Sequence, residues 1–339
     1  MKIIRTKSRS ARNPSRTGGV IRAAAALALA LAIVPSLALA QAYPSKPVRL
    51  VTPYAPGGIT DQLARLAAEK LKDRLGQPFI VENKAGGGTT IASNYAAKQP
   101  NDGYTLYQQS ATLGRATVLY DGAAYDPVRD FAAIGTLCNL PIVFIAAMNT
   151  PFKSVAELIT FAKTNPGKLS QGVAGIGSLD HIAGEMFARQ AGIKMNFIPY
   201  KGGALALNDV LGGRLDLQMD SWVIFGPQVA AGRIKALAAL TATRSSSLPD
   251  MVTAAESGLP GYEAFGAWFG LFTMAGVPRD IITRLNREIG EILKDPDLQA
   301  RYKTWGMSTY YTTPEQMAEL LKKDIASVVP LIKELGIKL

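Results

Sequence analysis

The alternation of short apolar strands with amphipathic helices is the feature that most limits how this chain can fold. It begins at Pro47, and the first helix places Leu63, Leu66 and Leu71 at helical spacing before ending at Gly76. The strands predicted in this part are VRLVTPY (48–54), PFIVEN (78–83) and YTLYQQS (104–110). Such alternation is typical of an α/β fold with mainly parallel sheets.

Two segments far apart in the chain resemble each other. Residues 140–166 and 269–296 each read as an apolar strand, a proline and a long helix. The block between them has its own units, with predicted strands at 168–174, 194–200, 214–220 and 234–240 and helices at 179–190 and 203–212. A middle domain inserted between two crossing strands predicts a two-lobed, hinged protein. The predicted boundaries are 41–143 and 268–339 for lobe 1 and 144–267 for lobe 2.

The first 40 residues have the pattern of a cleavable signal peptide. A basic region precedes the apolar run AAAALALALAIVPSLALA (23–40), which Pro35 interrupts, and Ala38-Leu39-Ala40 supplies the small-x-small pattern before Gln41. An uncleaved membrane anchor is the alternative, because about 18 residues approach the length that spans a bilayer. The proline and the cleavage pattern favour removal, so we predict that the mature protein is exported and soluble.

The net charge of +11 comes mostly from this N-terminal segment. Residues 1–40 contain seven Lys or Arg and no Asp or Glu, so residues 41–339 carry 30 basic against 26 acidic side chains. The remaining chain has neither a basic run nor a basic patch interleaved with aromatic residues. We therefore exclude nucleic acid as a partner.

Cysteine and histidine are too rare for most metal or redox chemistry. Cys138 is the only cysteine and His181 the only histidine of the sequence. An intramolecular disulfide and a cysteine metal cluster are therefore both impossible. We expect Cys138 to act as a small buried hydrophobic residue, and we predict neither a metal site nor a cofactor.

The stretch TPYAPGGITDQLAR (52–65) joins the first predicted strand to the first helix. Gly57 and Gly58 let backbone N–H groups approach a ligand, and Thr60 or Asp61 can cap the helix. Free N–H groups and the positive helix end favour a bound phosphate, sulfate or carboxylate. An ordinary tight turn between strand and helix is the equally open alternative.

Two other predicted strand ends carry polar side chains, at the edge of the sheet where α/β proteins bind ligands. Ser110 and Thr112 offer two hydroxyl groups, and we expect the nearby Arg115 to lie at the surface rather than to pair with an anion. In LQMDSW (217–222), Asp220 can hydrogen-bond a ligand or cap the next helix.

The loop GVAGIGSLDHIAGE (172–185) fails the tests for two kinds of chemistry. From Gly175 it resembles a dinucleotide fingerprint, but Asp180 stands where the third glycine belongs. Ser178 and His181 would lie on one helical turn, without a strained nucleophile elbow or an evident oxyanion partner. Together, the loops predict the binding of a small acid rather than its turnover, with no catalytic residue.

Ordered motifs from residue 43 to the end of the chain resemble those of one family. They are YPSKPVRLVTPYAPGG-TD, GQPFIVENKAGGG, QPNDGYTL, YDPVRDF, PFKSVAEL, G-x-G-S-x-x-H-x-A-G-E, IPYKGGALALNDVLGGRLDL and GLPGYEAFGAWFGL. The chain resembles the substrate-binding proteins of the tripartite tricarboxylate transporter family, the Bug-type periplasmic receptors. This resemblance implies a periplasmic-binding-protein (venus-flytrap) fold with a mainly parallel sheet in each lobe and two crossing strands as hinge.

The resemblance also implies a ligand site between the lobes. The Pro56-Gly57-Gly58 loop and the Ser110–Thr112 loop would hold one carboxylate, and the Gly175–Ser178 loop with His181 would close from the other lobe. The predicted ligand-binding residues are Tyr54, Pro56, Gly57, Gly58, Thr60, Asp61, Ser110, Ala111, Thr112, Gly175, Ile176, Gly177, Ser178, His181, Asp220 and Trp222.

The resemblance implies a non-enzymatic receptor that delivers a small carboxylate to a membrane permease of one large and one small subunit. We expect a monomer. Two alternatives stay open: a ligand sensor that docks on a membrane signalling partner, and an exported hydrolase that uses Ser178 and His181. The neighbouring genes would distinguish a sensor from the receptor. Turnover of a substrate would distinguish a hydrolase from it.

Departures from the family pattern suggest a narrower hypothesis about the ligand. Where relatives often read S-S-G-x-G, this chain has Val173-Ala174-Gly175-Ile176-Gly177. Where they often read F-D-N, it has Met219-Asp220-Ser221, followed by Trp222. The loss of two hydroxyls and the gain of Ile176 and Trp222 predict a less polar pocket and an aromatic or otherwise partly apolar carboxylate rather than citrate. Arg115, if it turned inward, would favour a dicarboxylate.

Overall fold

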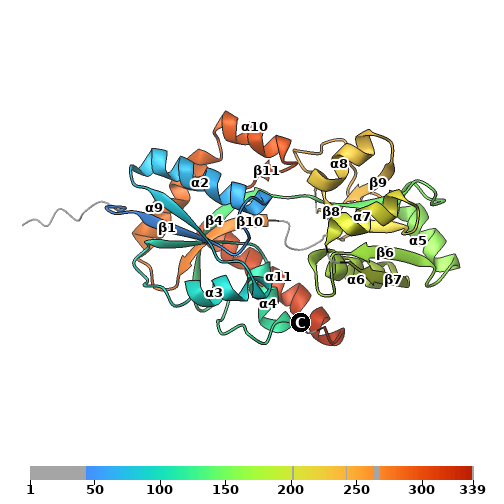
Figure 1. The fold of residues 1–339 in the computed structure, drawn as a ribbon, viewed down its shortest axis with the longest axis horizontal. Coiled ribbons are helices and arrows are strands. Elements are labelled where there is room, and N and C mark those ends of the chain that lie inside the picture. Colours follow the sequence, from blue (N-terminus) through green and yellow to red (C-terminus); the bar gives the residue numbers. More distant parts are fainter. Residues whose placement is uncertain (1–42, 201, 242, 263–267, 338–339) are drawn as a thin grey trace, which may run out of the picture. The chain divides into compact units, whose positions relative to one another are not determined.

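The computed structural model describes residues 43–200, 202–241, 243–262 and 268–337. The predicted signal peptide lies outside them. Among the described residues the strands form two sheets, and each sheet is the centre of one lobe (Figure 1). This confirms the predicted α/β class and the two-lobed arrangement. In the same residues, no helix is both long enough and apolar enough to cross a bilayer.

The first sheet has the strand order β11–β4–β10–β3–β1–β2. Its strands are β1 Val48–Thr52, β2 Phe79–Asn83, β3 Thr105–Gln109, β4 Phe131–Asn139, β10 Trp268–Met274 and β11 Ser308–Thr309. The helices of this lobe are α2 Ile59–Leu75, the short η1 Gly87–Thr89, α3 Thr90–Ala96, α4 Thr112–Leu119, α9 Arg279–Ile292, α10 Pro296–Thr304 and α11 Pro314–Glu334. Figure 1 shows α2 and α9 on one face of the sheet and α3, α4 and α11 on the other.

The second sheet has the strand order β7–β6–β8–β5–β9. Its strands are β5 Ile142–Ala147, β6 Leu169–Val173, β7 Met195–Pro199, β8 Leu217–Ser221 and β9 Ile234–Ala239. The helices of this lobe are α5 Val155–Thr164, α6 Leu179–Ala191, α7 Gly203–Leu211 and α8 Trp222–Ala230. The strands and helices predicted between 168 and 240 agree with these bounds to within three residues.

The sheets are mixed, so the prediction of mainly parallel sheets is wrong. β1 pairs in parallel with β2 and β3, but β10 runs antiparallel to β3 and β4. In the second sheet, β6 pairs in parallel with β7 and β8, but β5 runs antiparallel to β8 and β9. The antiparallel strands include the pair that carries the chain between lobes, since β4 leads into β5 through residues 140–141. A strand that arrives from the other lobe does not share the direction set by strand–helix–strand crossovers.

The strand β4 is absent from the sequence prediction. Its sequence, FAAIGTLCN, is interrupted by glycine and lacks a clear alternation of apolar and polar residues. It forms nonetheless because β10 pairs along it from Trp268 opposite Asn139 to Met274 opposite Phe131, with two register shifts. Cys138 lies in this strand, fully buried and unoxidised, as expected.

The sequence of β5 is an unbroken apolar run because both faces of this strand are buried. Phe144 and Ala146 belong to the core beneath α5 and α6, whereas Val143 and Ile145 belong to the core beneath α7 and α8. Because successive side chains point to opposite faces of a strand, both sets must be apolar. The second lobe is therefore a sheet covered by helices on both faces.

Candidate functional site

A cavity of about 300 Å³ lies where loops of the two lobes meet. We call it the Arg115 cavity. The described residues that line it are Tyr54, Gly88, Thr89, Ser110, Thr112, Arg115, Leu119, Tyr120 and Phe269 from the first lobe, with Leu140, Ile142, Gly177, Ser178 and Leu179. Five of the predicted site residues are among them: Tyr54, Ser110, Thr112, Gly177 and Ser178.

Arg115 lies inside the protein, so the prediction of a surface position is wrong. Arg115 is 6% exposed, belongs to α4 and lines the cavity. The helix α4 begins after the two residues that follow β3, Arg115 is its fourth residue, and α11 packs on this helix. A guanidinium in this position places a positive charge at the wall of a small cavity.

Hydroxyl groups surround the guanidinium of Arg115. Its Nη2 donates to Thr112 Oγ1 at 2.7 Å, and Ser110 Oγ donates to the same oxygen at 3.0 Å. The N–H of Ser110 donates to Gln109 Oε1 at 2.9 Å, which fixes the end of β3. These contacts fix the hydroxyls of Ser110 and Thr112 at the N-terminus of α4.

Burial dominates the electrostatics of this region. It lowers the pKa of Arg115 to about 10, although Tyr54 and the Asp324 carboxylate oppose the shift. Burial also raises the pKa of the Tyr54 hydroxyl, and its neighbours Ser110, Arg115 and Thr112 only partly offset this. Both shifts show that the surroundings solvate charge poorly. An anion bound beside Arg115 would therefore favour its charged form.

The glycine loop before α3 forms another wall of the cavity. Gly86, Gly87 and Gly88 have φ values of 121°, 54° and 55°, and Thr89 continues the run at 82°. A Cβ atom on Gly88 would lie 2.0 Å from the ring of Tyr120, so only glycine fits there. The signal for this loop was visible as the AGGGTT stretch, but we assigned it no role in the site.

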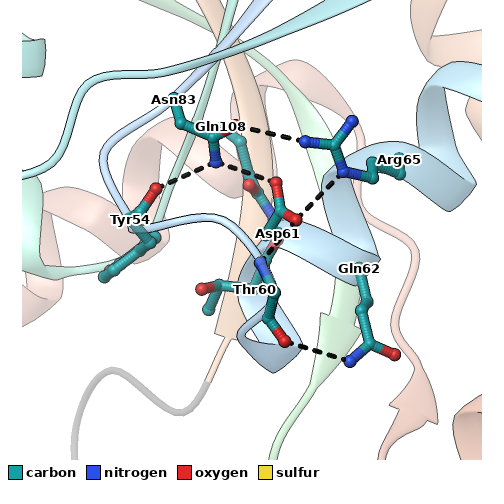
Figure 2. A network of polar contacts seen from close by, with 8 residues as sticks. Tyr54, Thr60, Asp61, Gln62, Arg65, Asn83 and Gln108 are labelled. Atoms are coloured by element: carbon teal, nitrogen blue, oxygen red, sulfur yellow. Dashed lines mark hydrogen bonds and ion pairs between the residues drawn. The ribbon is translucent and has the colours of Figure 1, made fainter.

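The turn between β1 and α2 is held by one buried carboxylate (Figure 2). Asp61 is 2% exposed, and its Oδ2 accepts from the Gly57 N–H at 2.9 Å and from Arg65 Nε at 3.0 Å. Its Oδ1 accepts from Asn83 Nδ2 at 2.8 Å. Burial by itself would raise the pKa of Asp61, but Arg65, Gly57 and Asn83 outweigh it and hold the pKa at about 2.

This network changes how the first predicted loop is understood. The N-cap of α2 is Gly58, without a side-chain cap, so the prediction that Thr60 or Asp61 caps the helix is wrong. The N–H of Gly57 is engaged by Asp61, and Thr60 accepts through its carbonyl from Gln108 Nε2. Pro56, Gly57 and Gly58 are exposed and lie outside the lining of the Arg115 cavity.

The turn between β6 and α6 in the second lobe has a similar construction. Asp180 Oδ2 accepts from the Ala174 N–H at 2.7 Å, and His181 Nδ1 accepts from the Gly177 N–H at 3.0 Å. His181 is 5% exposed, and burial lowers its pKa. The Ser178 hydroxyl donates to the carbonyl of Gly175 at 2.6 Å rather than to His181. The hydrogen bond between nucleophile and base that a hydrolase needs is thus not formed by this pair.

The last predicted loop places its two residues in different surroundings. Burial raises the pKa of Asp220 to about 6; the Ser221 N–H opposes this shift and the Asp180 carboxyl adds to it. Trp222 lines a separate cavity with Leu248 and Met251.

The structure does not place the other predicted contacts on the Arg115 cavity. Outside its described lining are Pro56, Gly57, Gly58, Thr60, Asp61, Ala111, Gly175, Ile176, His181, Asp220 and Trp222. Val173 is fully buried in β6, and Ile176 is 42% exposed at the surface. The aromatic-ligand hypothesis therefore gains no support from Val173, Ile176 or Trp222.

Apolar side chains that the sequence did not single out complete the cavity. They are Leu119, Tyr120, Leu140, Ile142, Leu179 and Phe269. Among the described lining residues Arg115 is the one charged side chain, and the described chain holds no group of three or more acidic, His or Cys side chains suited to a metal. The arrangement can hold a small organic anion by one guanidinium, several hydroxyls and an apolar wall.

The sequence matches a known family over most of its length. The model of the tripartite tricarboxylate transporter family receptor, TctC, matches residues 63–337. A protein of Pseudomonas sp. (strain P51), described as a "UPF0065 protein in tcbD-tcbE intergenic region", is 35% identical over 310 residues, 90% of this chain and 92% of that protein. Protein BugT of Bordetella pertussis is 32% identical over 302 residues, 88% of this chain and 92% of that protein.

Solved structures agree with this match. The structure titled "R. palustris Rpa4515 with adipate" has 34% identity and a TM-score of 0.72, covering 88% of this chain and all of that one. The periplasmic binding protein BugD has 35% identity and a TM-score of 0.68 over the same shares. MatC from Rhodopseudomonas palustris with bound malate has 31% identity and a TM-score of 0.67, covering 84% of this chain and 98% of that one. The chain therefore belongs to the tripartite tricarboxylate transporter receptors and has the two-lobed periplasmic-binding-protein fold of its Bug-type members.

Proposed function

We propose that this protein is an exported receptor that binds a small carboxylate in the Arg115 cavity. The observation that carries the proposal is a buried guanidinium at the wall of a cavity lined by hydroxyl and apolar side chains. A guanidinium and hydroxyl donors can hold a carboxylate by charge-assisted hydrogen bonds. Relatives with bound adipate and malate support the same ligand class.

The two lobes supply different parts of the cavity. Tyr54, Thr112 and Arg115 come from the first lobe, and Gly177 and Leu179 come from the second. A ligand that touches both sets favours the closed arrangement, because only that arrangement offers all of the contacts. We propose the hinge at the crossing between β4 and β5, with lobes of residues 41–143 plus 268–339 and 144–267.

The remaining predicted contacts are kept as part of this proposal for the closed state. The Pro56–Gly58 turn follows β1 and the Gly175–Ser178 loop follows β6, while His181 lies in the first turn of α6 and Asp220 lies near the end of β8. The Asp61 carboxylate, by contrast, holds the first turn rather than a ligand. We propose binding without turnover, since the hydroxyl of Ser178 is committed to Gly175.

The wider role follows from family membership. We propose that the first 40 residues direct export to the periplasm and that the monomeric receptor delivers its ligand to a permease of one large and one small subunit. Neither a cofactor nor nucleic acid enters this role.

The test is a thermal-shift and calorimetric screen of the purified protein with carboxylic acids. A ligand at one hundred times its dissociation constant adds about 2.7 kcal/mol to the free energy of unfolding. We expect Arg115→Met to abolish the shift, because it removes the cation but keeps much of the side-chain volume. The control is Arg129→Met, which removes an exposed arginine paired with Asp130.

Two results would contradict the proposal. One is the absence of a shift with every acid for the wild-type protein after bound ligand has been stripped by refolding. The other is an unchanged dissociation constant in Arg115→Met. The melting temperature of the ligand-free variant separates loss of binding from loss of folding.

A further inference from the structure

Thr89 has a backbone conformation that a threonine rarely adopts. Its φ of 82° makes it the one non-glycine residue with positive φ in the described part of the chain. For a β-branched residue such a φ is an outlier that persists only where the surroundings enforce it. Here the Thr89 N–H donates to the carbonyl of Gly86, and its own carbonyl accepts from Ser93 Oγ at 3.0 Å.

The usual reason for a threonine at this place does not apply. Thr89 precedes α3 as its N-cap residue, where a hydroxyl ordinarily accepts from a backbone N–H of the first turn. In this structure its side chain makes no capping hydrogen bond. Glycine, which precedes it three times, would adopt the same φ without strain. The side chain therefore needs another explanation.

The hydroxyl of Thr89 is buried at the wall of the Arg115 cavity. The residue is 6% exposed, and among the described residues its Oγ1 has no hydrogen-bond partner. A buried hydroxyl without a partner is costly, and such groups in folded proteins call for a reason. Strain, burial and an unsatisfied hydroxyl thus occur together on one residue that lines the ligand cavity.

We propose that Thr89 is a specificity-determining residue whose hydroxyl binds a hydroxyl group on the ligand. The inference rests on the proposed function, in which Arg115 holds the carboxylate. The two residues enter the cavity from different strand ends, since Thr89 follows β2 and Arg115 follows β3, with β1 between these strands. Both residues line the Arg115 cavity, so one ligand there can contact both.

The lining decides the class of the second group and of the ligand body. Among the described lining residues Arg115 is the one basic side chain, so a second buried carboxylate would lack a cation and be costly. A neutral hydroxyl can both donate to and accept from Thr89. Leu119, Leu140 and Phe269 offer contact to a hydrocarbon body. The ligand is a hydroxy-substituted monocarboxylate with an apolar body.

The experiment measures dissociation constants by calorimetry for two matched series of probes. The first is hexanoate, 6-hydroxyhexanoate and adipate; the second is benzoate, 3-hydroxybenzoate and 4-hydroxybenzoate. The variants are Thr89→Val, which removes the hydroxyl but keeps the branched shape, and Thr89→Ser, which keeps the hydroxyl. Thr89→Gly removes both the hydroxyl and the strain.

In the wild type we expect a hydroxy acid to bind about tenfold more tightly than its parent acid in at least one series, as one buried hydrogen bond allows. Thr89→Val and Thr89→Gly should reduce this ratio to about one, and Thr89→Ser should keep it. Thr89→Gly should also raise the melting temperature of the ligand-free protein by roughly 2–4 °C, because strain is relieved. A residue with a merely structural role would not change the ratio.

Three outcomes would overturn the inference, and they differ in what else they remove. If Thr89→Val keeps the wild-type ratio while Arg115→Met abolishes binding, the inference fails and the proposed receptor stands. If adipate binds best and Thr89→Val weakens it selectively, the second group is a carboxylate and the assigned class is wrong. If no probe binds the wild type, the carboxylate proposal fails and the inference fails with it.

Discussion

Two turns between strand and helix, one in each lobe, share a construction and differ in the pKa of their buried aspartate. In the first, Asp61 accepts from the N–H of Gly57; in the second, Asp180 accepts from the N–H of Ala174. Both aspartates lie in the first turn of their helix and are nearly fully buried. Yet the pKa of Asp61 is held at about 2, whereas burial raises that of Asp180 above its usual value.

The neighbours of each carboxyl explain the difference. Arg65 bonds to Asp61 directly, and Asn83 adds a second side-chain donor. The hydrogen-bond donors to Asp180 are neutral backbone N–H groups, such as that of Ala174, and they do not offset its burial. The same turn can therefore hold a fixed negative charge or a carboxyl that resists ionisation, depending on residues outside the turn.

The largest expected effect is that of Asp61→Ala. It removes the acceptor of two side-chain donors and one backbone donor, so we expect a loss of about 3 kcal/mol in the free energy of unfolding. Urea denaturation at neutral pH measures it. Asp73→Ala, on the exposed face of the same helix, is the control and should change little. Equal losses in the two variants would mean that the network of Figure 2 contributes nothing to stability.

The pH dependence of stability should have opposite signs in the two lobes. Asp61 ionises more easily in the folded state, at about 2 instead of 3.8. Its contribution of about 2 kcal/mol is therefore present above pH 4 and is lost as the pH falls towards 2. Asp220, which the Asp180 carboxyl affects, has a folded-state pKa raised to about 6. Its contribution is present below pH 4 and is lost as the pH rises through 6.

Denaturation of Asp61→Asn and Asp220→Asn between pH 2 and 7 tests both signs. In Asp61→Asn, the free energy of unfolding should no longer fall as the pH drops from 4 towards 2. In Asp220→Asn, it should change less between pH 4 and 6 than in the wild type. The same change of slope in both variants would mean that the lobes do not differ in this way.

Replacing the glycines of the two turns should have a moderate effect. Gly57 has a φ of 89° and Gly175 a φ of 149°, and an added Cβ would meet open space at either place. Backbone strain alone should then cost about 1 kcal/mol in Gly57→Ala and in Gly175→Ala. Gly122→Ala is the control, because Gly122 lacks a positive φ and an added Cβ would lie 4.0 Å from the nearest atom, Thr90 Oγ1. Thermal unfolding of the three variants would refute the strain argument if Gly122→Ala were the most damaging.

The smallest effect should come from Asp180→Asn. Because burial already disfavours its charged form, the neutral amide should change the free energy of unfolding at pH 7 by less than about 1 kcal/mol, in the stabilising direction. The amide oxygen can still accept from the Ala174 N–H. Urea denaturation measures the free energy of unfolding of Asp180→Asn and of Asp61→Asn side by side. We expect Asp61→Asn to be destabilised. A destabilisation of Asp180→Asn equal to that of Asp61→Asn would remove the distinction between the turns.

Local sequence was sufficient for most of the fold. The spacing of Leu63, Leu66 and Leu71 placed α2, which ends at Gly76 as predicted. The strand β4 was not predicted, because FAAIGTLCN has little alternation of apolar and polar residues and forms a strand through its pairing with β10. The antiparallel direction of some strands was not predicted for a related reason. No local sequence pattern indicates from which lobe a strand arrives.

The candidate site was predicted less completely than the fold. Tyr54, Ser110 and Thr112 were identified because hydroxyls at strand ends are a local feature. Arg115 was assigned to the surface because arginine is rarely buried, and Asp61 was assigned to the ligand although Arg65 and Asn83 engage it.

By itself, the sequence determined the class of the fold, the positions of the loops at the strand ends and, through its ordered motifs, the family. Only the tertiary structure decided which side chains share a cavity, that Arg115 is inside, and that Thr89 is strained with an unsatisfied hydroxyl. The reason is physical. Periodicity and turn chemistry act over a few residues, whereas burial, charge compensation and the pKa of each group depend on neighbours that the chain brings together from distant positions.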